Sequence, residues 1–279
     1  MASWQWISDY NSSSVVTIFL LSDIPVPVER RSRFVTLSGE VRVPGVYRVE
    51  PGDTLRNLVD RAGGLTPMAY LFGADFQRVS TREEESQDLQ RAVSIAQKEL
   101  TARASKVTLN ETAESAANKQ KSLDLQKVEI QRLAATQPSG RIVLDIPPGA
   151  TSANAIPELP LEDGDVLHVP VRGGVVQVIG AVNNENALIY HKNFRVKDYL
   201  AKAGGPTREA DLKRLFILRA DGSVVGDKHG LEHMRLMPGD AIVVPNKTFT
   251  FNLMNSITSW AQIVSQFGLG IAAVKVISN

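Results

Sequence analysis

Val35-Thr-Leu-Ser-Gly39-Glu-Val41 alternates between apolar and polar residues and has a glycine at its fifth position. Alternation with a period of two is typical of a β-strand that has one buried face. A second stretch, Val176-Gln-Val-Ile-Gly180-Ala-Val182, has the same pattern with its glycine at the same place. The chain therefore contains an internal repeat in which each unit begins with a strand.

Each strand is followed by a short amphipathic segment that ends in two glycines, Leu55 to Gly64 in the first unit and Val196 to Gly205 in the second. A Gly-Gly pair after such a segment is typical of a helix end. Each unit then closes with a Gly-Asp turn and a β-rich run, Glu162 to Pro170 and Met237 to Pro245. Pro44 to Tyr47 in the first unit and Ala187 to Tyr190 in the second occupy comparable positions after the first strand. The resulting order strand, strand, helix, strand, strand predicts two β-grasp domains and a mixed α+β fold class.

The first unit contains a long insertion. From the double glycine to the closing Gly-Asp, the first unit spans 101 residues and the second spans 35. Within the insertion, Glu83 to Leu133 has no Gly or Pro and is rich in helix-forming residues, which predicts a helical hairpin with a bend between Ser105 and Glu114. Ser80 and Glu83 fit a capping box at its start. The hairpin either packs on itself or forms a docking surface for a neighbouring subunit or partner.

The C-terminal end carries an uncharged stretch from Thr248 to Val274. On a helix over Asn252 to Val276, apolar and polar residues separate onto opposite faces. At 1.5 Å per residue this helix is roughly 37 Å long, enough to cross a hydrocarbon layer of about 30 Å. The predicted lipid-facing residues are Leu253, Ile257, Trp260, Val264, Phe267 and Ile271, and the predicted lumen-facing residues are Asn255, Thr258, Ser259, Gln262 and Gln266.

Three placements of this helix are open from the sequence. A single spanning copy would leave Asn, Gln and Ser side chains in lipid, whereas a ring of copies would turn them toward a shared aqueous lumen. A helix docked on its own domain would also explain the pattern. A helix lying flat on a membrane fits less well, because interfacial helices carry Lys and Arg on the polar face and only Lys275 lies near.

Composition excludes several other functions. Lys and Arg number 31 against 30 Asp and Glu, so the net charge of +1 gives no electrostatic reason to expect a nucleic acid partner. The absence of cysteine removes thiolate catalysis and Cys-ligated zinc. His229-Gly-Leu-Glu-His233 fits the inverted zinc-protease pattern, but Gly230 weakens the helix that this pattern requires. We therefore expect no catalytic site, no bound metal and no cofactor.

These patterns predict four segments along the chain. Residues 1–34 form an N-terminal segment with one strand, and residues 35–171 form the first β-grasp domain with the hairpin insertion at about 81–138. Residues 172–247 form the second β-grasp domain, and residues 248–279 form the amphipathic membrane helix. The N-terminal sequence has no basic region before its apolar run and no small-residue cleavage site, so we expect a mature form or a fragment if the protein is exported.

The Gly39 to Tyr47 run, the Ala-Gly-Gly helix ends and the closing Gly-Asp segments that end in Val-Pro resemble soluble ligand-binding β-grasp (SLBB) domains. Two such domains before a terminal amphipathic helix resemble the outer-membrane polysaccharide export proteins of the Wza type, over residues 35–276. This resemblance implies a homo-oligomeric, octamer-like ring in the bacterial outer membrane with β-grasp domains in the periplasm. It also implies contact with outer-membrane lipid, a polysaccharide cargo and an inner-membrane polysaccharide co-polymerase as partner.

The sequence therefore predicts a non-enzymatic channel subunit that exports capsular or exopolysaccharide to the cell surface. Family members usually carry a lipidated cysteine and a separate export domain before the β-grasp repeats, and these 279 residues contain neither. The alternative is a soluble periplasmic glycan-binding module without a pore, in which the terminal helix packs on the protein.

Overall fold

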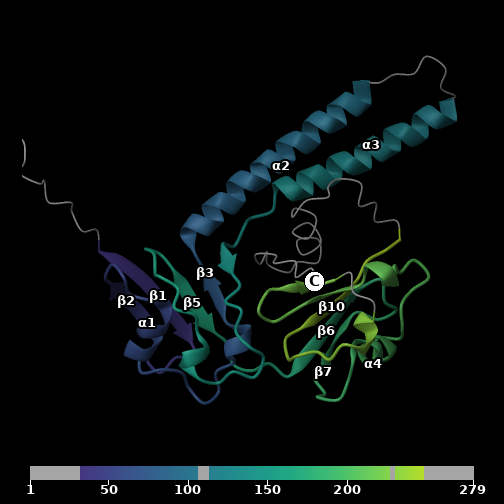
Figure 1. Cartoon of the computed structure of the whole chain (residues 1–279). Helices are drawn as coiled ribbons and strands as arrows, with labels where there is room; N and C mark the ends of the chain where they lie inside the picture. Colours follow the sequence, from purple (N-terminus) through teal and green to yellow (C-terminus); the bar gives the residue numbers. More distant parts are fainter. Residues whose placement is uncertain (1–31, 106–112, 227–229, 248–279) are drawn as a thin grey trace, which may run out of the picture. The chain divides into compact units, whose positions relative to one another are not determined.

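The computed structural model describes residues 32–105, 113–226 and 230–247 (Figure 1). Within these ranges the chain forms two five-stranded sheets and a pair of long helices, a mixed α+β fold. The fold class expected from the sequence is thereby confirmed for the two sheets. The C-terminal amphipathic helix and the N-terminal strand lie outside the described residues, and the domain boundaries stay a prediction.

The first sheet has the strand order β2-β1-β5-β3-β4. Its central strands β1 and β5 run parallel, and β1 pairs with β2 antiparallel. This parallel central pair is the β-grasp crossover that the sequence predicted. The strands are β1 (Arg33–Gly39), β2 (Gly45–Val49), β3 (Asp75–Gln77), β4 (Arg141–Ile142) and β5 (Val166–Val169).

The second sheet repeats this topology in the order β7-β6-β10-β8-β9, with β6 and β10 parallel at its centre. Each sheet therefore has five strands rather than the four predicted, because β4 and β9 are only two residues long and leave no readable periodicity. The strands are β6 (Val175–Gly180), β7 (Asn186–Ile189), β8 (Phe216–Leu218), β9 (Val224–Val225) and β10 (Ala241–Val244).

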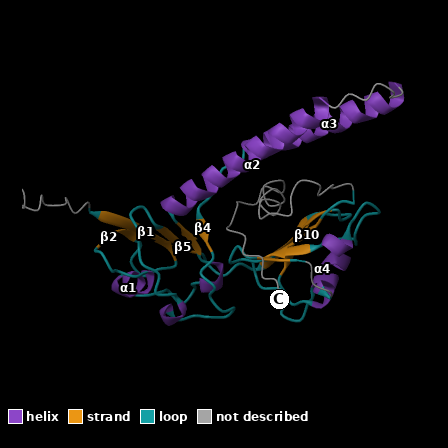
Figure 2. Cartoon of the chain, turned by 45° about the horizontal axis from the view of Figure 1, so that its top comes forward, coloured by secondary structure: helices purple, strands orange, loops and turns teal. Residues whose placement is uncertain are grey.

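One short helix covers one face of each sheet, α1 (Leu55–Arg61) in the first and α4 (Val196–Lys202) in the second (Figures 1 and 2). Leu55, Leu58 and Val59 of α1 are buried in a core with alternate residues of β1 and β5. In the second core Tyr199 of α4 is completely buried beside β6 and β10. Both sheets thus bury one face under a helix, as strand alternation requires.

The insertion consists of α2 (Val79–Ser105) and α3 (Ala113–Ala134), which lie side by side in Figures 1 and 2. The expected helical hairpin is therefore present, and the expected capping box is wrong. The helix begins at Val79, so Ser80 lies inside its first turn, and the Ser80 hydroxyl donates to Glu162 Oε2 at 2.7 Å instead. The described part of the hairpin buries four apolar residues, Ala92, Ala96, Ile130 and Leu133.

The repeated strand glycines have a steric role. Gly39 and Gly180 have φ of 77° and 97°, a left-handed region that favours glycine. A Cβ on Gly180 would lie 2.2 Å from the carbonyl oxygen of Val244, and a Cβ on Gly39 would lie 2.1 Å from that of Val169. Each glycine lets the first strand of its unit approach the end of the closing strand.

Substitution of Gly180 with alanine is expected to lower the free energy of unfolding by about 3 kcal/mol, because backbone strain and a clash with Val244 add. Gly205→Ala is the matched control, since Gly205 has φ of 81° but a Cβ added there would meet no other atom within 4 Å. It should cost about 1 kcal/mol. Urea unfolding of both variants measures the difference, and equal losses would contradict the close-approach role.

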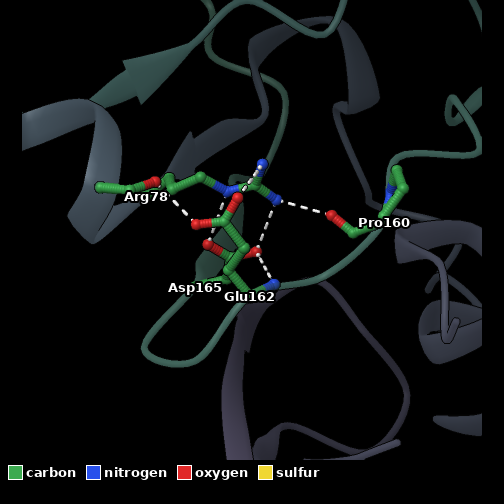
Figure 3. A network of polar contacts seen from close by, with 5 residues as sticks. Arg78, Pro160, Glu162 and Asp165 are labelled. Carbon is green, nitrogen blue, oxygen red and sulfur yellow. Dashed lines mark hydrogen bonds and ion pairs between the residues drawn. The ribbon is translucent and has the colours of Figure 1, made fainter. Parts of the chain in front are cut away.

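A buried ion pair fixes the closing turn of each domain. In the first domain Arg78 Nη2 lies 2.9 Å from Asp165 Oδ2 and donates to the carbonyl oxygen of Pro160 at 2.7 Å (Figure 3). Arg78 Nη1 also lies 3.0 Å from Glu162. Asp165 is completely buried and accepts a further bond from the Glu162 backbone N–H. In the second domain Arg219 Nε lies 3.1 Å from the equally buried Asp240.

Replacing Arg78 with methionine should lower the free energy of unfolding by about 3–5 kcal/mol, because the buried Asp165 carboxylate loses its counter-charge. Arg48→Met is the control, since the Arg48–Glu50 pair is largely exposed, and it should cost less than about 1 kcal/mol. Thermal or chemical unfolding of the two variants tests this, and similar losses would show that the Arg78 pair does not fix the turn.

Candidate functional site

The faces predicted for the C-terminal segment, from Leu253 to Ile271 and from Asn255 to Gln266, lie outside the described residues. Of the helices that the structure describes, none has the length and apolar character needed to cross a membrane. His229 also lies outside the described ranges. Leu231–His233 forms one short 3-10 turn, which differs from the helix of a zinc-protease pattern. The described residues contain no group of three or more His, Asp or Glu placed to hold a metal ion.

A row of polar side chains crosses the open face of the first sheet. Ser38 of β1 is paired with His168 of β5, which is in turn paired with Asp75 of β3. The Ser38 hydroxyl lies 3.0 Å from His168 Nδ1. These residues alternate with the buried Leu37, Leu167 and Phe76, so they lie on the face away from α1.

Serine, histidine and aspartate in one row do not have the geometry of a hydrolytic triad here. In a triad the carboxylate orients one ring nitrogen while the hydroxyl contacts the other. Asp75 instead accepts from Gln77 Nε2 at 2.9 Å, and its other oxygen lies 3.2 Å from Arg141 Nε. The Asp75 carboxylate is therefore held by Gln77 and Arg141, and the row presents fixed polar groups on an open sheet.

The aromatic ring of Phe34 lies further along the same face. Phe34 belongs to β1, faces the same side as Ser38 and is 48% exposed. It is paired across the strands with Arg48, and Val46 beside it is 67% exposed. One face of the first sheet thus combines an exposed aromatic ring with oriented hydrogen-bonding groups.

The equivalent face of the second sheet has a different character. Ile179, Val243 and Phe216 occupy the places of Ser38, His168 and Asp75, as the matching strand registers show. Val243 and Phe216 are completely buried. The two units therefore have similar cores, but at these three positions the first sheet carries polar residues and the second carries apolar ones. Further along β6, Val175 is 41% exposed.

In the described part of the chain, side chains of the first domain donate hydrogen bonds to backbone carbonyl groups of the second. Tyr70 donates to the carbonyl oxygen of Pro238 at 2.9 Å, and Arg141 donates to that of Ala220 at 2.9 Å. The Arg219 guanidinium, which also pairs with Asp240, lies 5.2 Å from the ring centre of Phe72. Burial raises the pKa of Asp240 to about 6, against the opposing effect of the Arg219 charge. The closing turn of the second domain is therefore also a contact point with the first.

None of these surface residues was identified from the sequence. The polar row joins β1, β3 and β5, and Asp75 and His168 are separated by the whole hairpin. Alternation within each strand places Ser38 and His168 opposite the buried face, but only the strand order brings them together. The order of the strands in the sheet could not be read from the local sequence patterns, so these residues were missed.

Parts of the chain are similar to a known domain family and to known proteins. The SLBB domain family matches residues 34–77 and 175–228, which begin at β1 and β6. Two curated Escherichia coli proteins, both called polysialic acid transport protein KpsD, are each 30% identical to this chain over 147 residues. The match covers 51% of this chain and 25% of each relative, so the chain spans about a quarter of their length. The chain therefore has two regions that match the SLBB domain, and over about half of its length it is similar to these polysialic acid transport proteins.

Proposed function

We propose that this chain is a subunit of a ring-shaped outer-membrane channel that exports capsular or exopolysaccharide from the periplasm to the cell surface. The observation that carries the proposal is the duplicated SLBB fold followed directly by an uncharged amphipathic sequence. Relatives that transport polysialic acid support a polysaccharide cargo. In this proposal the SLBB domains stack around the cavity and the C-terminal helices form an α-helical barrel.

The second domain holds the residues just before the C-terminal segment in a fixed position. All four residues of β10 are buried, and the chain leaves β10 toward the C-terminal segment. Lys247 is fixed by two bonds, from its backbone N–H to the carbonyl oxygen of Glu209 and from its Nζ to that of Arg208. A fixed exit point supports a defined direction for the segment that begins at Thr248.

The polar face of the predicted helix suits a moving polymer. Amide and hydroxyl side chains such as Asn255, Ser259 and Gln262 can bond sugar hydroxyls without the strong attraction of a charge. Selectivity would come from lumen diameter and from these weak, repeated contacts. The polymer would reach the ring from an inner-membrane polysaccharide co-polymerase, the partner class that the family resemblance implies.

Removal of the C-terminal segment tests the pore directly. Electron microscopy of the full chain in detergent should show closed rings with a protruding barrel, and a chain ending at Asn246 should lose the barrel. A monodisperse monomer in both forms, soluble without detergent, would contradict the pore and favour the periplasmic glycan-binding module.

A pair of charge substitutions tests the assignment of helix faces. Val264→Asp places a carboxylate on the predicted lipid face, whereas Gln262→Asp places it on the predicted lumen face. The lipid-face charge should cost about 2.5–3.5 kcal/mol and reduce membrane association, because lipid cannot solvate it. The lumen-face charge should be tolerated. Vesicle flotation of both variants is the measurement, and equal behaviour would show that the faces are wrongly assigned.

A further inference from the structure

We propose that the open face of the first sheet, formed by Phe34, Ser38, Gln77 and His168, binds an extended saccharide chain. This inference rests on the proposed export function and adds a contact surface in the first domain.

The aromatic end of the face suits a sugar ring. Phe34 is 48% exposed on β1, where it pairs with Arg48 of β2 and its carbonyl oxygen accepts from the Gly164 backbone N–H. The apolar face of a sugar ring stacks on such a ring, and the contact buries C–H groups on both partners. Exposed Val46 beside Phe34 extends the apolar area.

The polar end of the face suits sugar hydroxyls. A hydroxyl group both donates and accepts, so it needs partners of both kinds. His168 offers one ring nitrogen beyond the one at Ser38, and Gln77 keeps a carbonyl oxygen while its amide group bonds Asp75. Because Ser38 and Asp75 already orient these side chains, little conformational entropy is lost on binding.

The separation of the two ends favours a chain over a single sugar. Phe34 and Ser38 are four residues apart on β1, which corresponds to about 13 Å along the strand. That distance exceeds the width of one sugar ring, so a ligand that reaches both ends must contain several rings.

The second sheet has the same topology as the first but carries different residues at the positions of the proposed site. The equivalent positions of the second sheet carry Val175, Ile179 and Val243, which cannot hydrogen-bond a hydroxyl. Since both sheets share one topology and one type of core, folding alone does not require the polar row. The polar row is therefore a property of the first domain's outer surface.

Histidine NMR of the full chain in detergent, with 13C-labelled imidazole rings, tests the proposal. The chain has four histidines, at 168, 191, 229 and 233, so three of them serve as internal controls. Titration with maltohexaose and with an oligosialic acid of six units probes neutral and acidic chains separately. The His168 resonance should shift with at least one sugar while the other three stay in place.

Phe34→Ala should weaken that binding roughly three- to tenfold, because stacking is lost. Val175→Ala, at the equivalent exposed place in the second domain, should leave it unchanged. Absence of a His168 shift with both sugars, or an affinity that Phe34→Ala leaves unchanged, would overturn the site. So would a His168 shift that follows protein concentration without sugar, which would mark a subunit contact. Rings seen by microscopy together with any of these results would leave the proposed channel intact.

Discussion

In each domain a buried aspartate pairs with an arginine that follows a neighbouring strand, and this ion pair fixes the turn before the closing strand. Asp165 and Asp240 lie directly before the closing strands, and without Arg78 and Arg219 each would be a carboxylate buried without a counter-charge. In the first domain Arg78 is also the last residue before α2, so the same ion pair anchors the base of the hairpin. In the second domain Arg219 extends to Phe72 and so takes part in the contact between domains.

The sequence predicted most of the fold because its signals are local. The two strand glycines, the Gly-Gly helix ends and the Gly-Asp turns each depend on a few neighbouring residues, and together they define the β-grasp order. The Arg78–Asp165 pair could not be predicted in this way, because 87 residues separate the partners. Asp165 belongs to the Gly-Asp turn that the sequence predicts, but that pattern does not predict that its side chain is completely buried.

The capping box and the number of strands were predicted wrongly because both depend on contacts between distant residues. Ser80 and Glu83 fit the capping-box spacing, but β3 leads into the helix earlier than the composition suggests, and the Ser80 hydroxyl bonds Glu162 across the domain. Strands β4 and β9 form because the sheet offers an edge beside β3 and β8, which a two-residue sequence cannot reveal. The predicted lipid-facing and lumen-facing residues stay predictions, since they lie beyond Lys247.

Duplication followed by divergence gives the two domains separate tasks in the proposed channel. The second domain carries the buried Phe216 and Val243 where the first carries Asp75 and His168, and it ends in the fixed Lys247. The first domain carries the polar row and the hairpin. The most direct measurement is the release of a fluorescent polysaccharide from liposomes that contain the full chain. The proposed function predicts release with the full chain and retention with a chain ending at Asn246. Retention in both cases, or equal release in both, would contradict it.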